Sequence, residues 1–192
     1  MKRILAVLAL LPALFTYAQQ NHRETVSYKR LKNDTIVWRK DSLLTKEDFR
    51  AKHGHNTAGF ASVGIFMNPK ESGGTIVFDV EATFLKSKSF LVENSPYTLE
   101  HEQLHFDICE IFARKLRKMM MDKDFKKVRD IRGEIQKMYN KVSADMYKEE
   151  NKYDDDTQHG LNPAKQKVWD EDIAKQLQDI DAYSNITVNI TQ

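Results

Sequence analysis

A chain of 192 residues has the length of one typical domain and is long enough to bury a hydrophobic core. Lys and Arg total 30 and Asp and Glu total 28, but Lys2 and Arg3 belong to an N-terminal leader. The rest of the chain therefore has a formal net charge of zero, without the basic excess typical of nucleic-acid-binding proteins. The single cysteine, Cys109, excludes an intrachain disulfide bond.

Residues 1–18 have the features of a secretory signal peptide. Two basic residues precede a twelve-residue apolar run, which is too short to cross a bilayer. Ala18 supplies the small residue that precedes a cleavage site and would leave Gln19 as the first mature residue. We therefore expect an exported protein, periplasmic or secreted, without stable membrane insertion, in which residues 19–192 form a single domain.

Five segments rich in apolar and β-branched residues predict the strands of a small, mainly antiparallel sheet: residues 26–31, 36–38, 60–67, 75–84 and 186–190. The clearest is 75–84, where apolar residues such as Ile76 and Val80 alternate with polar ones such as Asp79. This period of two predicts one buried face and one mostly polar face. Asn68-Pro69 is expected to end the strand that precedes it.

The most informative motif is the pentad His101-Glu102-Gln103-Leu104-His105, in a helix predicted from Pro96 to about Met121. Ser95 is a favourable N-cap, and proline suits the first helical position. Because residues four apart lie on the same helical face, both imidazole rings can reach one metal ion. Glu102 is rotated by about 100° from His101, so its carboxylate can reach a water molecule beside the ion without binding the ion itself.

This arrangement predicts a zinc site. Neutral imidazole nitrogens suit Zn²⁺, and three protein ligands with one open position make a site catalytic. Cys109 follows His105 by one turn, but a straight helix rarely supplies three ligands to one tetrahedral ion, so we interpret Cys109 as a buried apolar residue. An edge strand beside the site can pair with an extended peptide, and residues 60–67 or 75–84 are the candidates.

The third ligand is expected from the segment that follows a second helix. That helix is predicted from about Asp124 to Asn151, and a short connection to the first helix makes an antiparallel hairpin. Residue 144 would then lie level with His101, and the chain beyond the helix can curl back to the metal. His159 is the predicted third ligand. Four acidic residues are the alternatives: Glu149, Glu150, Asp154 and Asp155.

Three further residues near the motif have predicted roles. Tyr153 is the candidate for stabilising an oxyanion, because a phenol near the metal can donate a hydrogen bond to it. Asp154 or Asp107 is expected to orient a ligand imidazole through a hydrogen bond. A third helix is predicted to begin at Asn162-Pro163.

The residues around the pentad resemble a bacterial family of unknown function whose members are described as predicted secreted zinc-dependent proteases. The shared core is HEQxHFDIxE, at residues 101–110, in which Leu104 stands where the family pattern has Gly. A later Tyr-Asp-x-x-Thr-x-His-Gly motif is matched by residues 153–160. Further matches lie along most of the chain: Trp38, Asp48-Phe49, residues 113–116, Gln166 and Trp169.

The residues and the resemblance together predict an α+β, zincin-like domain, in which a small antiparallel sheet packs on the HExxH helix beside a helical hairpin and a C-terminal helix. The predicted function is a zinc metallopeptidase that acts on a peptide or protein substrate. His101, His105 and His159 would hold Zn²⁺, and Glu102 would act as the general base. Two alternatives remain open: a non-catalytic, zinc-stabilised module that binds envelope components, and a zinc amidase that acts on a cell-wall amide. A closed set of four protein ligands would favour the binding module.

Overall fold

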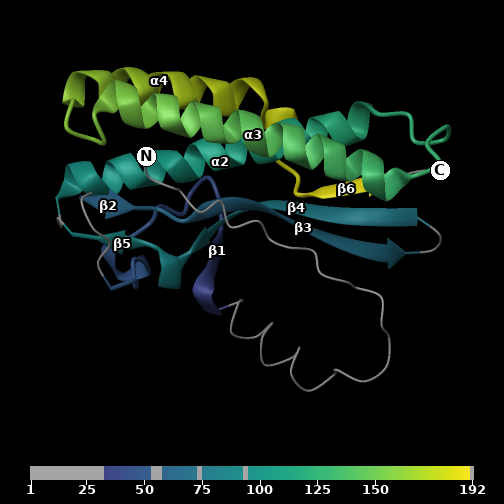
Figure 1. Cartoon of the computed structure of the whole chain (residues 1–192), viewed down its shortest axis with the longest axis horizontal. Helices are drawn as coiled ribbons and strands as arrows, with labels where there is room; N and C mark the ends of the chain where they lie inside the picture. The colour runs from purple at the N-terminus through teal and green to yellow at the C-terminus, as the bar shows by residue number, and fades with distance from the viewer. Residues whose placement is uncertain (1–32, 53–57, 73–74, 93–94, 191–192) are drawn as a thin grey trace.

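The computed structural model of the protein describes residues 33–52, 58–72, 75–92 and 95–190. The predicted signal peptide and the predicted strand 26–31 lie outside these ranges. Within them the chain forms a small antiparallel sheet, and three long helices cover one of its faces (Figure 1). The predicted α+β class is therefore confirmed.

β4, Thr75–Leu85, is the central strand of the sheet. It forms a long antiparallel hairpin with β3, Val63–Ser72. Its other edge carries two short strands, β6 (Thr187–Ile190) near its start and β1 (Thr35–Val37) near its end. The predicted strands at 36–38, 75–84 and 186–190 are thus confirmed, each shifted by no more than one residue at either end.

The predicted strand 60–67 is wrong at both of its ends. Gly59–Phe60 forms β2, which pairs with β5, Phe90–Leu91, in a separate two-stranded sheet. The chain re-enters a strand at Val63, and β3 then continues through Pro69, which lies opposite Phe78. A proline has no backbone N–H, so a strand that contains one cannot form all the hydrogen bonds needed to pair with neighbours on both of its edges. It is tolerated here because, among the described strands, β3 pairs with β4 alone.

The alternation in β4 builds the core. Val80, Ala82 and Phe84 are fully buried, and Phe84 packs against Phe106 of α2, Pro96–Asp122, with ring centroids 5.9 Å apart. α2 contacts the sheet on one side and the two remaining long helices on the other, so it is the central layer of the fold (Figure 1). The HExxH helix is therefore the most enclosed helix of the molecule.

The predicted starts of the first and third helices, at Pro96 and at Asn162-Pro163, are confirmed. Ser95 accepts a hydrogen bond from the backbone N–H of Thr98 at 3.1 Å, and proline occupies the first turn of α2. α4, Pro163–Asp179, begins in the same way, with Asn162 as the cap for the N–H of Lys165. Three short 3₁₀ turns complete the connections: η1 (Lys46–Asp48), η2 (Lys86–Lys88) and η3 (Asp181–Tyr183).

α3 differs from its prediction by about two turns. It spans Ile131–Thr157, whereas the sequence indicated Asp124 to Asn151. The true cap is Asp130, whose carboxylate accepts a hydrogen bond from the N–H of Gly133 at 2.8 Å. The connection from α2 is consequently longer, and the residue that lies level with the pentad is Asp154 rather than residue 144.

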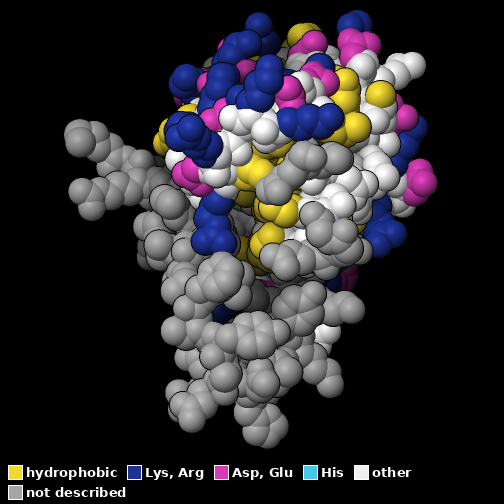
Figure 2. Space-filling view, turned by 90° about the vertical axis from the view of Figure 1, so that its right-hand side faces the viewer, with side chains coloured by type: hydrophobic (Ala, Val, Ile, Leu, Met, Phe, Trp, Pro, Cys, Tyr) yellow, Lys and Arg dark blue, Asp and Glu magenta, His cyan; other side chains and the backbone are white. Residues whose placement is uncertain are grey.

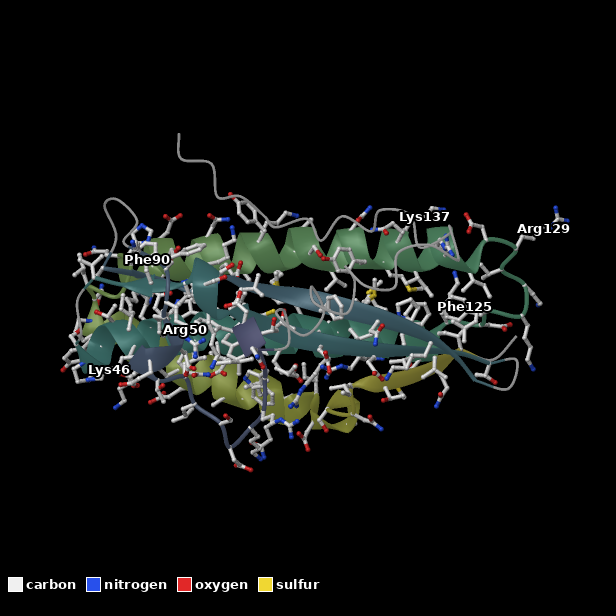
Figure 3. The ribbon with its side chains drawn as sticks, turned by 90° about the horizontal axis from the view of Figure 1, so that it is seen from below. Lys46, Arg50, Phe90, Phe125, Arg129 and Lys137 are labelled. Carbon is white, nitrogen blue, oxygen red and sulfur yellow. The ribbon has the colours of Figure 1, made fainter. Side chains whose placement is uncertain are left out.

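The turn between α2 and α3 lies at the end of the molecule opposite the pentad. Phe125 and Arg129 mark this end, and Phe90 of β5 marks the other (Figure 3). Lys and Arg side chains gather over its helices with Asp and Glu among them (Figure 2). Ion pairs such as Lys123 with Glu134, at 2.7 Å, connect the two charge types. In the described part of the chain, none of the helices combines the length and apolar character needed to cross a membrane.

Candidate metal centre

The pentad lies in the first half of α2, where neighbouring elements enclose the helix. α3 and α4 contact α2 on one side, and β2 approaches the helix at Glu102. His101 and Glu102 are only 4% and 3% exposed. Buried polar groups need hydrogen-bond partners inside the protein, and the partners of these two residues define the site.

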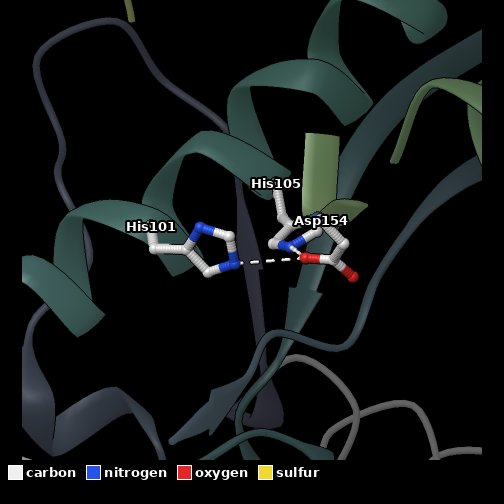
Figure 4. A group of neighbouring side chains, drawn as sticks. All are labelled: His101, His105 and Asp154. Atoms are coloured by element: carbon white, nitrogen blue, oxygen red, sulfur yellow. Dashed lines mark hydrogen bonds and ion pairs between the residues drawn. The ribbon is translucent and has the colours of Figure 1, made fainter. Parts of the chain in front are cut away.

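The Nε2 atoms of His101 and His105 converge on the carboxylate of Asp154, in the last turn of α3 (Figure 4). Their distances to Oδ1 of Asp154 are 3.2 and 3.1 Å. Ligand atoms of these three residues all lie within 4.8 Å of one another, so the group could hold a metal ion. The structure thus gathers both predicted histidines and one predicted alternative for the third ligand.

The chemistry of this group suits zinc. Bonds from zinc to nitrogen or oxygen ligands are about 2.0–2.2 Å long, which places ligand atoms on one tetrahedral ion about 3.3 Å apart. The observed separations of 3.2 and 3.1 Å between Oδ1 of Asp154 and the two histidine nitrogens are close to this value. Two imidazoles and one carboxylate also form a set that leaves one coordination position open, as catalytic zinc sites do.

His159 lies at the edge of the group. Its Nδ1 is 3.4 Å from Oδ1 of Asp154, but its side chain is 60% exposed and it is not one of the three gathered residues. It belongs to a left-handed turn that ends α3, in which Gln158, His159 and Gly160 have φ angles of 53°, 55° and 81°. Zinc ligation by His159 stays a prediction.

The remaining acidic alternatives do not join the group that the described residues form. Asp155 is exposed and Glu149 is partly exposed. Glu150 lies one turn before Asp154, and its Oε1 is buried with no hydrogen-bond partner among the described residues. Burial raises the pKa of Glu150 to about 7, although the nearby His105 opposes this change.

Asp154 controls the charge of the group. Burial by itself would lower the pKa of His105, but the hydrogen bond and the negative charge of Asp154 outweigh it and raise the pKa to about 9. Burial likewise favours a neutral Asp154, yet hydrogen bonds from His101 and His105 hold the pKa of its carboxyl well below the usual range. A proton on Nε2 of His105 therefore occupies the place that a metal ion would take, and metal binding must release it.

The carboxylate of Glu102 faces Gly59 of β2. A Cβ atom added to Gly59 would lie only 2.6 Å from Oε1 of Glu102, so the absence of a side chain at Gly59 makes room for the carboxylate. Burial raises the pKa of Glu102, while nearby His105 and His101 and a backbone hydrogen bond from Ala61 lower it in part. A buried carboxylate with a raised pKa, beside two imidazoles that could hold a metal ion, is suited to accept a proton.

Tyr153 is completely buried beneath the histidines. Its ring stacks on that of His101, with centroids 4.6 Å apart and 25° between the planes. Its hydroxyl donates to Oε1 of Gln166 at 2.8 Å and approaches the backbone oxygen of His101 at 3.1 Å. Burial also raises its pKa. The hydroxyl thus faces fixed acceptors inside the protein, and the predicted oxyanion role is left without geometric support.

Asp107 has other partners than a ligand imidazole. It accepts hydrogen bonds from the indole of Trp38 at 2.7 Å and from the side-chain amide of Gln103 at 2.9 Å. The oxygen of the same Gln103 amide accepts from the N–H of Leu44 at 2.8 Å. These bonds attach the N-terminal part of the described chain to α2. Of the two residues predicted to orient an imidazole, Asp154 is therefore the one that contacts the histidines.

Sequence comparison adds one finding about this site. Residues 95–160 match the family described as Bacterial protein of unknown function (DUF922). The DUF922 match spans α2, α3 and the left-handed turn, and hence every residue discussed above for metal binding. It confirms the predicted resemblance to a bacterial family of unknown function, and its description states no activity. Neither the curated proteins nor the solved structures contain a match to the chain.

Gln166 is a residue of the site to which the sequence assigned no role. It is buried on α4, and its Oε1 lies 3.2 Å from Nδ1 of His101. In the sequence, Gln166 was noted only as one of the further matches to the family, together with Trp169. The signal that could have drawn attention to Gln166 was Asp170, four residues later, because glutamine and aspartate at this spacing form hydrogen bonds along a helix.

Proposed function

We propose that the protein is a zinc-dependent peptidase with a zincin-like arrangement of the HExxH helix against the sheet. The observation that carries this proposal is the convergence of His101, His105 and Asp154 beside a buried Glu102. We assign Asp154 as the third ligand, in preference to the predicted His159, because its carboxylate is already at ligand distance from both imidazoles.

Each of these residues would have a separate role in the proposed hydrolysis of a peptide bond. His101, His105 and Asp154 would hold a zinc ion, which would supply Lewis acidity and lower the pKa of the attacking water towards about 7. Glu102 accepts a proton on its carboxylate from the attacking water and passes it to the nitrogen of the leaving amine. Tyr153 packs against His101 and is a positioning residue in this proposal.

The sheet favours an extended peptide as the substrate. β4 has strands on both edges, so among the described strands β3 is the long one with a free edge. The segment that leads into β3 includes Ala61, whose backbone is hydrogen-bonded to Glu102. A peptide that paired with this edge would lie beside the proposed general base.

The first test is the zinc content of the purified protein, followed by digestion of denatured casein. We expect about one zinc per chain. Glu102→Gln should keep the metal and lose hydrolysis by roughly 10²-fold or more. Glu100→Gln is the matched control, because Glu100 lies on the exposed side of the same helical turn. Zinc binding with unchanged hydrolysis in Glu102→Gln would refute the mechanism, and zinc binding without any hydrolysis would favour the binding module.

The third ligand can be tested separately. Asp154→Ala should lower zinc affinity far more than His159→Ala, because Asp154 touches both ligand imidazoles whereas His159 is mostly exposed. Asp155→Ala is the control, since Asp155 is the exposed neighbour of Asp154 on the same helix. Competition with a chelator measures all three affinities. A large loss in His159→Ala with little change in Asp154→Ala would restore His159 as the third ligand.

A further inference from the structure

Gln166 of α4 is held between an acidic residue on its own helix and the ring of His101 on α2. We propose that Gln166, oriented by Asp170, keeps a proton on Nδ1 of His101 and so presents Nε2 as the nitrogen that binds the metal. Gln166 is then a positioning residue that acts through His101. This inference rests on the proposed zinc site, and it assigns a role to a pair of residues outside the part of the chain that matches DUF922.

The first step is the orientation of the Gln166 amide. Its Nε2 lies 2.9 Å from Oδ1 of Asp170, one turn along α4. A carboxylate only accepts hydrogen bonds, so the atom that faces it must be the –NH₂ group. The reversed amide would place two oxygens in contact. Asp170 therefore fixes the carbonyl oxygen of Gln166 on the side of the metal centre.

The second step is the consequence for His101. Oε1 of Gln166 has two neighbours that can donate, the hydroxyl of Tyr153 at 2.8 Å and Nδ1 of His101 at 3.2 Å. An amide oxygen carries no hydrogen, so the hydrogen bond to the ring requires a proton on Nδ1. The tautomer of a histidine is generally set by the partner of the nitrogen that does not bind the metal. Here that partner is a neutral amide.

The third step is the position of the ring. Tyr153 stacks against it, and the backbone of Gly160 lies so close that an added Cβ atom would be 3.2 Å from Cγ of His101. With Nδ1 fixed by Gln166, Nε2 is directed at Oδ1 of Asp154, 3.2 Å away, and donates its own proton there until a metal ion replaces that proton. The ring therefore cannot exchange its two nitrogens without breaking the bond to Gln166. Partners of this kind typically change metal affinity by about 10–100-fold when they are removed.

The test compares three forms of the full-length chain. Gln166→Leu removes the acceptor at nearly constant volume. The double variant Gln166→Glu with Asp170→Asn moves the carboxylate and the amide to each other's positions, so an acceptor faces His101 and the bond along α4 is kept. Gln176→Leu is the control, because Gln176 forms the same kind of bond to Asp172, at 2.8 Å, on the exposed side of α4.

Two measurements decide the outcome. The first is the zinc affinity by chelator competition, and the second is the ¹⁵N chemical shifts of the His101 ring in the metal-free protein. We expect Gln166→Leu to weaken zinc binding by about 10–100-fold and to lose the hydrogen-bonded Nδ1 proton. The double variant should recover most of the affinity, and Gln176→Leu should match the unmodified chain. If Gln166→Leu does not fold, Asp170→Ala takes its place, because it frees the amide to rotate and should also weaken zinc binding.

The inference is overturned if folded Gln166→Leu or Asp170→Ala binds zinc as the unmodified chain does, or if the double variant is no better than Gln166→Leu. It is also overturned if Nδ1 of His101 carries no proton in the unmodified, metal-free protein. Absence of zinc binding in the unmodified chain would instead refute the proposed function. The ¹⁵N shifts would still decide whether Gln166 fixes the tautomer, so the two failures remain distinguishable.

Discussion

Gly59 and Glu102 show how one residue without a side chain makes room for a functional one. Glu102 is buried, and its Oε1 occupies space that a Cβ atom at position 59 would enter, at 2.6 Å. Cγ2 of Thr98 and Cδ2 of Leu91 lie 3.0 Å from the same point. A Cβ atom at position 59 would therefore force the carboxylate of Glu102 to move.

The Gly59→Ala variant should consequently displace the carboxylate of Glu102 without changing the proposed metal ligands. We expect normal zinc content and a loss of casein hydrolysis of roughly tenfold or more, because a displaced general base transfers protons poorly. Gly64→Ala is the matched control, since a Cβ atom at Gly64 meets nothing within 4 Å. Equal activity in the two variants would show that the position of Glu102 does not limit the reaction.

Glu150 allows a prediction about pH in the metal-free protein. Burial raises its pKa to about 7 in the folded state, against an ordinary value of 4.5 in the unfolded chain. Between these pH values the folded state holds a proton that the unfolded state has lost. The contribution of Glu150 to stability is therefore complete below pH 4.5 and is lost as the pH rises through about 7.

Glu150→Gln should remove this pH dependence. The variant should be as stable as the unmodified protein near pH 4.5 and more stable at pH 8, by on the order of 2 kcal/mol, since one pKa unit corresponds to about 1.4 kcal/mol and the side chain is partly exposed. Urea unfolding at the two pH values measures the difference. Glu149→Gln, at the adjacent position on the same helix, is the control. A Glu150→Gln variant that is less stable at pH 8 would show that the ionised carboxylate of Glu150 has a hydrogen-bond or ion-pair partner in the folded protein.

At the scale of elements, the correct predictions were those that rested on signals from residues close together in the sequence. The start of α2 was predicted correctly because its cap, Ser95, and the following proline act within one turn. β4 was predicted correctly because apolar and polar residues alternate along it, and Val80, Ala82 and Phe84 of the apolar face are buried. The start of α3 was misplaced because an apolar stripe gives the face of a helix but no start, and Asp130 was not recognised as the cap.

That misplacement also explains the choice of the third ligand. With α3 assigned too early, Asp154 was placed in a loop beyond the helix, where His159 was the better ligand by residue type. The true register puts Asp154 inside the helix, on the face that packs against His101 and His105. The HExxH half of the site could be predicted because its spacing is local, whereas the partners of His101 come from residues 53 and 65 positions away in the chain.

The cap of α3 provides a test at this scale. Asp130→Ala should lower the free energy of unfolding by about 1 kcal/mol, because the N–H of Gly133 loses its acceptor at the start of the helix. Asp130→Asn is the control, since asparagine is an equally good cap. Urea unfolding compares the variants. A loss in Asp130→Asn equal to that in Asp130→Ala would mean that charge, and not the cap, is what matters.

At the scale of the whole molecule, one buried ion-pair network joins the layers. Glu110 on α2 accepts from Arg114 at 2.9 Å and from Arg117 at 2.9 and 3.1 Å. Arg117 also donates to the backbone oxygens of Val80 in β4 and Tyr183 in η3. Arg114 donates to the backbone oxygen of Leu177 in α4. The network thus connects the sheet, the central helix and the helix that carries Gln166.

Arg117→Met should be among the most destabilising single changes in the chain. It removes four hydrogen bonds, two to backbone oxygens and two to the Glu110 carboxylate, and leaves Glu110 buried with Arg114 as its partner. Breaking a buried ion pair in this way typically costs about 3–5 kcal/mol. The double variant Glu110→Leu with Arg117→Met should regain part of that loss, because no acid is then left buried beside a single cation. Urea unfolding of the two single variants and the double variant gives the coupling energy. Additive losses would mean that the network does not act as a unit. A large coupling together with weakened zinc binding in Arg117→Met would show that the network also holds α4, and with it Gln166, in place against the metal centre.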